Sequence, residues 1–313
     1  MKKIILVGAS QMAIDYLKVL NELALDTIVV GRSEESALAF EKNTGHIVTR
    51  NGIEAYIDKN NEITRKAIIA TGVEQLSKNA ISLIKAGVKE ILIEKPGGTS
   101  INELKEISDH ANENNCKIFI AYNRRFYSSV ITAKKIIDED GGCKSFQFEF
   151  TEWSHKIEPL QKKAGVKENW FIGNSTHVVD MAFYLGGSPK EIKCYSSGNL
   201  TWHSKSVFSG AGISIQNALF SYHSNWQSPG RWVVEILTDK HRLIFKPLEE
   251  LQIQNIGSVT IDKVELEDNL DKDFKPGLFL QTKKFIENDF SDLKTLEEQI
   301  EDMYWYNQIL NGN

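Results

Sequence analysis

The stretch KIILVGASQMA, residues 3–13, decides the fold of the first part of the chain. A short apolar run ends at Val7, small residues follow at once, and Met12–Glu22 then carries apolar residues at helical spacing. A turn between a buried strand and a helix must be tight where the two elements pack closely. Gly8 and Ala13 meet this requirement, whereas Ser10 stands where a dinucleotide-binding turn usually has its second glycine.

The same alternation of strand and helix continues to residue 122. Strand-like runs at 27–30, 67–70, 90–93 and 117–122 are separated by helical patterns at 33–42, 75–86 and 100–114. Strands that are apolar throughout indicate a parallel sheet with both faces covered. We therefore predict an α/β fold whose N-terminal part is a Rossmann, doubly wound parallel sheet, with Ser33 as a helix N-cap and Gly87 as a left-handed residue after a helix.

The pattern changes after residue 123. A helix over 128–139 leads to Lys144–Trp153, where apolar and polar residues alternate, and a helix over 176–185 is followed by strand-like runs at 191–195, 211–222, 231–238, 242–245 and 259–264. Helices over 278–287 and 296–310 close the chain, and Thr295 and Glu298 have capping-box spacing. We predict two domains: a dinucleotide-binding domain, 1–123, and an α+β domain on a mostly antiparallel sheet, 124–313.

Composition excludes several classes of protein. The 313 residues carry 37 basic and 42 acidic side chains, a net charge of −5, which argues against a nucleic-acid or membrane partner. No apolar run approaches the roughly 20 residues of a spanning helix, and the apolar start of the chain ends by Ser10. The three cysteines are far apart, and no cluster has metal-ligand spacing. We expect a cytoplasmic protein without a metal.

The turn after the first strand and the end of the second strand predict a cofactor. Backbone N–H groups at Gly8, Ala9, Ser10, Gln11 and Met12 are expected to approach a pyrophosphate. An NAD site would place a carboxylate at the end of the second strand, but Arg32 and Ser33 occupy that position. A guanidinium can pair with a 2′-phosphate, so we predict NADP, with NAD possible. The alternative is a solvated arginine next to a helix cap.

A later strand, Glu90–Ile93, runs into Glu94-Lys95-Pro96-Gly97-Gly98. Ligands of open α/β sheets bind at the carboxyl ends of the strands, and a lysine fixed there by a proline offers a positioned ammonium group. With this segment the sequence resembles the glucose–fructose oxidoreductase / inositol dehydrogenase family (Gfo/Idh/MocA). Further matching features are the N-terminal turn, Ala70-Thr71, Ala86-Gly87, the segment Asn123–Phe126 and the His-x-x-Asp pattern of His177–Asp180.

The resemblance implies an NAD(P)-dependent oxidoreductase that transfers a hydride between nicotinamide and a secondary alcohol or ketone of a sugar, cyclitol or nucleotide-linked sugar. It implies that Lys95 lies near the nicotinamide, orients the substrate and assists proton transfer. Glu94 would position Lys95 or contact the cofactor, and Thr71 would also contact the cofactor. The second domain would form the wall of the substrate site, and the family generally pairs through its open sheet, so we expect a homodimer or homotetramer.

The resemblance makes His177 a proton donor or acceptor at the substrate hydroxyl, a role that suits an imidazole. The family usually has an Asp four residues earlier, where this chain has Gly173, so the proton route is incomplete. Asn174 or Ser175 is expected to cap the helix instead. Asp180 is a candidate substrate ligand or a domain-interface contact, and Asn174 is a further candidate substrate ligand.

Weaker candidates lie in the second domain. One of Arg124 and Arg125 is expected to anchor a salt-bridge network and the other to bind a ligand, for which we name Arg125. Trp153 could stack on a sugar or a base, and the loop with Lys162, Lys163 and Lys167 could hold a diphosphate. Two other functions stay open: a reductase of a non-sugar unsaturated substrate of imine or bilin type, and a non-catalytic dinucleotide-binding sensor or partner subunit.

Overall fold

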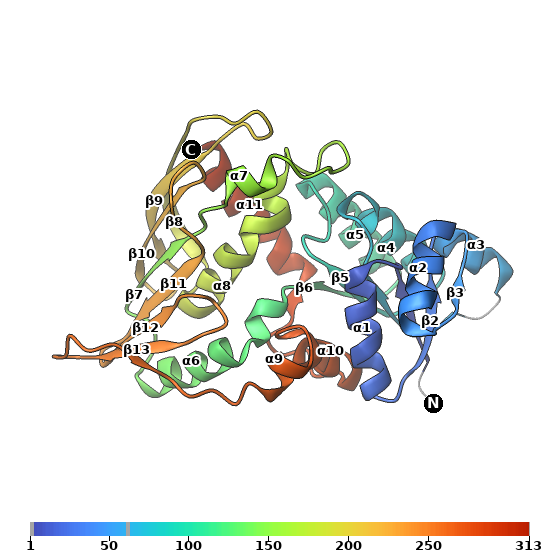
Figure 1. The fold of residues 1–313 in the computed structure, drawn as a ribbon, viewed down its shortest axis with the longest axis horizontal. Helices are drawn as coiled ribbons and strands as arrows, with labels where there is room; N and C mark the ends of the chain where they lie inside the picture. Colours follow the sequence, from blue (N-terminus) through green and yellow to red (C-terminus); the bar gives the residue numbers. More distant parts are fainter. Residues whose placement is uncertain (1–2, 61–62, 313) are drawn as a thin grey trace. The chain divides into compact units, whose positions relative to one another are not determined.

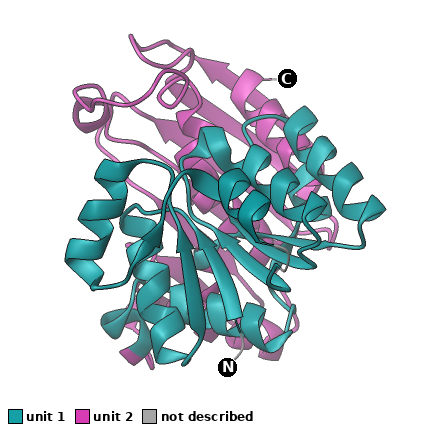
Figure 2. Ribbon diagram, turned by 90° about the vertical axis from the view of Figure 1, so that its right-hand side faces the viewer, with its two compact units in different colours: residues 1–123, 270–300 teal, residues 124–269, 301–313 magenta. Residues whose placement is uncertain are grey.

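The computed structural model describes residues 3–60 and 63–312 (Figure 1). These residues form two compact units, coloured separately in Figure 2. The first unit holds residues up to Asn123 together with Leu270–Ile300, and the second holds Arg124–Asn269 together with Glu301 onward. The division at residue 123 is where the sequence pattern changes. The prediction placed all residues after 123 in the second domain, whereas residues 270–300 belong to the first unit.

The first unit is built on a seven-stranded sheet with the order β15-β6-β5-β4-β1-β2-β3. All neighbours pair in parallel except β15, which pairs antiparallel with β6 and so brings 270–300 into this unit. The strands are β1 (Lys3–Val7), β2 (Asp26–Val30), β3 (Val48–Thr49), β4 (Lys66–Ile69), β5 (Glu90–Glu94), β6 (Lys117–Ala121) and β15 (Lys294–Thr295). The predicted Rossmann arrangement is confirmed.

Helices flank this sheet because each has one apolar face to bury. They are α1 (Gln11–Glu22), α2 (Glu34–Thr44), α3 (Gly52–Lys59), α4 (Leu76–Lys85), α5 (Ile101–Glu113) and α10 (Leu278–Glu287), with a 3₁₀ turn at Val73–Gln75. Ser33 caps α2 by accepting from the N–H of Ser36, and Gly87 has φ +97°, as predicted. The sequence pattern did not indicate β3 and α3, which are short.

The second unit is built on an eight-stranded sheet with the order β14-β13-β12-β11-β7-β10-β9-β8. Only the β7–β10 pair is parallel, which confirms the predicted mostly antiparallel sheet. The strands are β7 (Ser145–Glu149), β8 (Pro189–Ser197), β9 (Val207–Ser214), β10 (Leu219–Asn225), β11 (Val233–Leu237), β12 (His241–Phe245), β13 (Gln252–Asn255) and β14 (Asp262–Lys263). The single run expected at 211–222 is wrong: it is a hairpin that turns at Asn217, φ +66°.

One face of the second sheet is covered by helices (Figure 1). Phe146 and Phe148 of β7 lie on that face, and Phe148 packs edge-on against Phe183 with ring centres 5.8 Å apart. The helices of the second half are α6 (Ser128–Glu139), α7 (Ser154–Ile157), α8 (Thr176–Gly186), α9 (Asn269–Asp273) and α11 (Leu296–Asn311), with a 3₁₀ turn at Asn123–Phe126. α9 and α11 each begin in one unit and end in the other. The capping box at Thr295 and Glu298 is confirmed by both of its hydrogen bonds.

Candidate functional site

The turn after β1 requires glycine at position 8. Gly8 has φ +133°, and a Cβ atom there would lie 2.3 Å from the carbonyl oxygen of Ala70. That contact is with backbone, which cannot move aside as a side chain can. The backbone of the turn therefore lies directly against the end of β4, at the carboxyl edge of the sheet.

The N-terminus of α1 suits an anion. Ser10 stands at the N-cap but makes no capping bond, and its hydroxyl donates instead to the carbonyl of Ala70, at 3.3 Å. The first turn of α1 contains no acidic side chain, and Gln11 donates to Asp15 one turn later. First-turn N–H groups have no intrahelical partner and attract phosphate. The predicted turn thus fits the pyrophosphate of a dinucleotide.

The end of β2 presents a cation to solvent. Arg32 is exposed, and its Nη1 donates to the side-chain oxygen of Gln75 at 3.0 Å. Ser33 is engaged in the cap of α2, and its hydroxyl lies 2.7 Å from that of Ser36. A contribution of Ser33 to phosphate binding stays a prediction, but a guanidinium at this edge fits a 2′-phosphate better than a 2′-hydroxyl.

Arg50, which sequence reasoning missed, neutralises acids near this point. Its guanidinium donates to Glu34, the first residue of α2, at 3.0 Å and to Glu41 at 2.6 Å. The hydrogen bond from Arg50, together with one from the N–H of Val48, lowers the pKa of Glu41 to about 2. The pairing partly offsets the negative charge that Glu34 places next to Ser33. The periodicity of the sequence could not predict this pairing, because Arg50 meets Glu34 and Glu41 only when α2 lies against the segment after β3.

Lys95 follows β5 at the same edge of the sheet as Gly8. The strand order places β4 between β1 and β5, and the register aligns Val7 with Ile69 and Ile69 with Ile93. With neighbouring strands about 4.8 Å apart, the ends of β1 and β5 are separated by about 10 Å. Lys95 is only 9% exposed. Gln299 donates to the carbonyl of Pro96 at 3.0 Å and so helps to fix the segment.

Glu94 has a partner that the sequence did not indicate. The hydroxyl of Tyr16 donates to its Oε1 at 2.7 Å, and Gln281 donates to the same hydroxyl at 3.3 Å. Burial raises the pKa of Glu94. The hydrogen bond from Tyr16 and the positive charge of Lys95 act to lower this pKa, but burial outweighs them. The same burial raises the pKa of Tyr16. The Glu94 carboxylate is thus held from α1, and its predicted contact with the cofactor remains a prediction, as does that of Thr71, whose hydroxyl accepts from Asn79 at 3.2 Å.

His177 and Asp180 lie on α8 in the second unit, 9% and 1% exposed. The expected helix cap is wrong: Ser175 is itself helical, with φ −66° and ψ −25°, and makes no capping bond. The reason is that Phe171–Ser175 forms a π-helical turn that runs directly into α8. The helix therefore has no free N-terminus at residue 176 that would need a cap.

The side chains of Asn174 and Ser175 instead donate to Glu152, each at 2.8 Å to Oε1. Glu152 follows β7, is 1% exposed, and accepts from Arg231 through Oε2 at 3.2 Å. Burial raises its pKa, although these donors act in the opposite direction. Sequence reasoning missed Glu152. A carboxylate is thus present beside the turn that precedes His177, although position 173 is glycine.

Arg125 and Asp180 bind each other. The Arg125 guanidinium donates through Nε at 2.9 Å and through Nη2 at 2.8 Å to the two carboxylate oxygens of Asp180. Both side chains are buried, and the guanidinium also lies over the ring of Tyr184, 4.8 Å from its centre. A bidentate buried pair of this kind fixes the orientation of α8 relative to the 3₁₀ turn at Asn123–Phe126. Direct contact of either residue with substrate remains a prediction.

A row of cations and aromatic rings continues from this region. The guanidinium carbon of Arg231 lies 4.9 Å from the centre of the Trp153 ring and 4.4 Å from that of Trp232. Arg124 lies 4.9 Å from the same Trp232 ring, and the His177 ring is 6.4 Å from it. Trp153 is 45% exposed and donates through Nε1 to the carbonyl of Gly230. The second-unit candidates Trp153, Asn174, His177 and Asp180 thus lie around the end of β7 and the start of α8.

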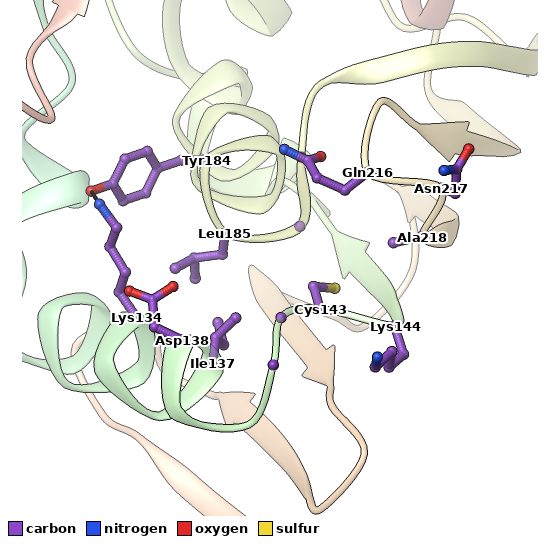
Figure 3. Close-up of a pocket in the computed structure, with 14 residues that line it drawn as sticks. Lys134, Ile137, Asp138, Cys143, Lys144, Tyr184, Leu185, Gln216, Asn217 and Ala218 are labelled. Atoms are coloured by element: carbon purple, nitrogen blue, oxygen red, sulfur yellow. Dashed lines mark hydrogen bonds between the residues drawn. The ribbon is translucent and has the colours of Figure 1, made fainter.

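A pocket of about 430 Å³ lies elsewhere in the second unit (Figure 3). Its lining includes Lys134, Asp138 and Cys143, together with Tyr184 and Gln216. It adjoins the start of β7 and the end of α8, whereas Glu152 and His177 lie at the opposite ends of these elements. None of the predicted site residues lines this pocket.

Among the described residues, the predicted lysine-rich loop does not bring its three lysines into one cluster of contacts. Lys162 and Lys163 are exposed, and Lys167 donates to the carbonyl of Glu158 at 2.6 Å. Within 3–60 and 63–312, no three His, Cys, Asp or Glu side chains are grouped so that they could hold a metal ion. In the same described ranges, no helix is both long and apolar enough to cross a membrane.

The first unit has the fold and the glycine turn that are typical of a dinucleotide-binding α/β domain, and the second unit is of the α+β class. Residues 2–122 match the oxidoreductase family GFO_IDH_MocA, described as having an NAD-binding Rossmann fold. This match agrees with the resemblance predicted from the Glu94-Lys95-Pro96 segment and covers residues 2–122, which include that segment.

Two curated relatives share part of the sequence. The chain is 22% identical over 180 residues to scyllo-inositol 2-dehydrogenase (NADP⁺) of Bacillus subtilis, which is 56% of this chain and 48% of that protein. It is 31% identical over 141 residues to levoglucosan dehydrogenase of Pseudarthrobacter phenanthrenivorans, which is 43% of this chain and 35% of that protein. The chain thus spans about half or less of the length of these relatives.

Solved structures share the whole fold. A levoglucosan dehydrogenase in complex with NADH superimposes with a TM-score of 0.81 at 17% identity, over 99% of this chain and 96% of that one. UDP-N-acetylglucosamine 3-dehydrogenase of Acidithiobacillus ferrooxidans gives a TM-score of 0.75 at 12% identity, over 98% and 96%. At these identities the likeness establishes the fold alone.

Proposed function

We propose that the chain is an NAD(P)-dependent dehydrogenase that acts on a secondary alcohol or ketone of a sugar, cyclitol or nucleotide-linked sugar. The observation that carries this proposal is the position of Lys95, a buried lysine on the same sheet edge as the glycine turn of a matched NAD-binding domain. The substrates printed in the names of similar proteins, an inositol, levoglucosan and a UDP-linked amino sugar, support the substrate class.

When bound, NAD(P) supplies a hydride acceptor or donor at C4 of the nicotinamide. Lys95 would orient the substrate oxygen and stabilise the negative charge that develops there as the hydrogen leaves carbon. His177 would take the hydroxyl proton in oxidation and return it in reduction. Arg125 and Asp180 would hold α8 in place, and Arg32 would favour NADP over NAD.

Hydride transfer tests this proposal directly. We expect the purified protein to reduce NADP⁺ with at least one member of a panel of sugars, cyclitols and UDP-sugars, followed by nicotinamide absorbance. Lys95→Met is expected to lower kcat by at least 100-fold with the affinity for NADP⁺ largely kept. Lys105→Met, an exposed lysine on α5, serves as the matched control and should leave turnover unchanged.

Three results would contradict the proposal. Near-normal turnover by Lys95→Met would exclude the assigned role of that residue. Turnover confined to imine or bilin substrates would favour the reductase alternative, and NADPH binding without turnover of any substrate would favour the sensor.

We also propose that the protein is a homodimer or homotetramer assembled through the open face of the second sheet, and that it acts in the cytoplasm. Tyr195, Ser209 and His223 lie in register across β8, β9 and β10 and are exposed, whereas the residue before each of them, Cys194, Phe208 and Tyr222, is buried. The cysteines Cys116, Cys143 and Cys194 are free thiols, which suits a reducing compartment. Light scattering of wild type and of Tyr195→Asp tests the assembly: a smaller species is expected for the variant, and a monomeric wild type would contradict the proposal.

A further inference from the structure

The guanidinium of Arg124, in the second unit, contacts aromatic rings but has no hydrogen-bond or ion-pair partner among the described residues. Its Nε is buried. Its recorded side-chain contacts are with the rings of Trp232, at 4.9 Å, and Tyr127, at 5.8 Å. Leaving the Nε–H donor buried and unpaired is costly unless a ligand satisfies it, and the guanidinium carries four further N–H donors that a ligand could contact.

A second donor beside it is also unsatisfied. Trp232 is 8% exposed, and its indole Nε1 is buried without a hydrogen-bond partner in the described chain. Indole N–H groups in buried positions usually find an acceptor. Arg124 and Trp232 therefore present unpaired donors from two elements, the 3₁₀ turn after β6 and the segment before β11, to the same neighbourhood.

Arg231 adds a second positive charge there. Its guanidinium lies 4.4 Å from the centre of the Trp232 ring and is hydrogen-bonded to Glu152 through Nη1 only, so further donors of its fork remain available. The two like charges of Arg231 and Arg124 repel each other. The carboxylates that act on Arg124 are Glu152, which is already engaged with Asn174, Ser175 and Arg231, and Glu249, which is exposed and makes no ion pair with it.

We infer that the substrate carries an anionic group, a carboxylate or a phosphate, and that Arg124 and Arg231 bind it beside Trp232. A planar fork suits either oxyanion, and an anion would offset the repulsion between the two cations as well as accept from the unpaired donors. The His177 ring, 6.4 Å from Trp232, lies close enough for one small molecule to reach both. This inference rests on the proposed function and narrows its substrate class to sugars that carry a carboxylate or a phosphate group.

Matched ligand pairs test this inference. Binding of D-glucose, D-glucuronate and D-glucose 6-phosphate to the full-length protein saturated with NADP⁺ is measured by calorimetry, so that no turnover is needed. We expect one or both acidic sugars to bind at least 10-fold more tightly than glucose. Arg124→Gln and Arg231→Gln should each abolish that preference, whereas Lys190→Gln, which removes an exposed charge from the same unit, should keep it.

The outcomes separate this inference from the proposed function. Equal binding of neutral and acidic sugars, no binding of any of the three, or a preference that survives Arg124→Gln would overturn the inference. A preference for glucuronate alone identifies a carboxylate, and one for the phosphate ester alone identifies a phosphate; both support it. Turnover of neutral sugars without any preference for acids would leave the proposed function intact. Selective anion binding without hydride transfer would instead refute that function and leave the anion site. Circular dichroism of each variant establishes that it is folded.

Discussion

Removal of the Glu152 side chain should destabilise the second unit and impair catalysis without affecting cofactor binding. In Glu152→Ala, Asn174 and Ser175 lose the acceptor that both contact at 2.8 Å, and Arg231 loses its ion pair. Each of the two hydrogen bonds contributes about 1 kcal/mol. The Arg231 side chain is 43% exposed, so its ion pair adds only about 0.5 kcal/mol. The expected loss is therefore about 2.5 kcal/mol.

Thermal unfolding followed by calorimetry measures this loss. At about 3 °C per kcal/mol for a unit of this size, the transition of the second unit should fall by roughly 7 °C. Ser175→Ala, which removes one of the two hydrogen bonds, should cost about 1 kcal/mol. We also expect Glu152→Ala to reduce kcat, because the turn that precedes His177 is no longer held, with the Kd for NADP⁺ unchanged. A transition within 1 °C of wild type, or a loss of NADP⁺ binding equal to the loss of turnover, would refute this reasoning.

Four further predictions concern the cofactor site, the stability of the second unit and its dependence on pH. Gly8→Ala should weaken NADP⁺ binding at least 10-fold in a fluorescence titration, because the new Cβ would lie 2.3 Å from the Ala70 carbonyl oxygen; unchanged binding would contradict the close approach. Arg32→Ala should weaken binding of NADPH far more than that of NADH, and equal losses would refute the NADP assignment. Asp140→Ala should cost about 3 kcal/mol, because the carboxylate is buried and accepts from Thr238 and His241; a change below 1 kcal/mol in denaturant unfolding would contradict this. Because burial raises the pKa of Glu152 above its ordinary 4.5, the folded state holds that proton more tightly, so wild type should lose stability relative to Glu152→Gln as pH rises above about 4.5; a difference that is constant with pH would refute it.

Asp140 should give a dependence of stability on pH that is opposite to that of Glu152. Burial alone would raise its pKa, but hydrogen bonds from Thr238, His241 and Lys240 outweigh that effect and lower the pKa below 3.8. Its contribution to stability is therefore present above about pH 4 and is lost as pH falls through the lowered value. Wild type and Asp140→Ala should converge in stability at low pH, and parallel curves would contradict this assignment.

Local patterns predicted much of the fold. The helices over 128–139 and 278–287 have the expected ends, because each has a continuous apolar face bounded by turn residues. The two-residue strands β3 and β15 are too short to produce a period, so β3 was missed, as was the return of 270–300 to the first sheet. Strand pairing between residues 174 and 176 positions apart, as between β15 and β6, leaves no local sequence pattern.

In the candidate site, too, local patterns predicted some residues, and contacts between distant parts of the chain determine the others. Gly8 and Lys95 could be found because each directly follows a strand, and the ends of parallel strands meet at one edge of the sheet. Glu152 and Arg231 could not, because they meet only through the pairing of β7 with β11. Tyr16 reaches Glu94 from a helix 78 positions earlier in the chain. The π-helical turn before α8 also has no recognised sequence pattern, and for that reason the predicted cap at Ser175 was wrong.

The central claim is that Lys95 acts on the substrate atom that exchanges hydride with the nicotinamide. A crystal structure of the protein with NADP⁺ and a turned-over substrate tests it most directly. The account predicts the Lys95 ammonium within about 3 Å of the reacting oxygen, with the carbon that bears it facing nicotinamide C4. A complex in which that ammonium points into solvent, far from both the nicotinamide ring and the bound oxygen, would contradict it.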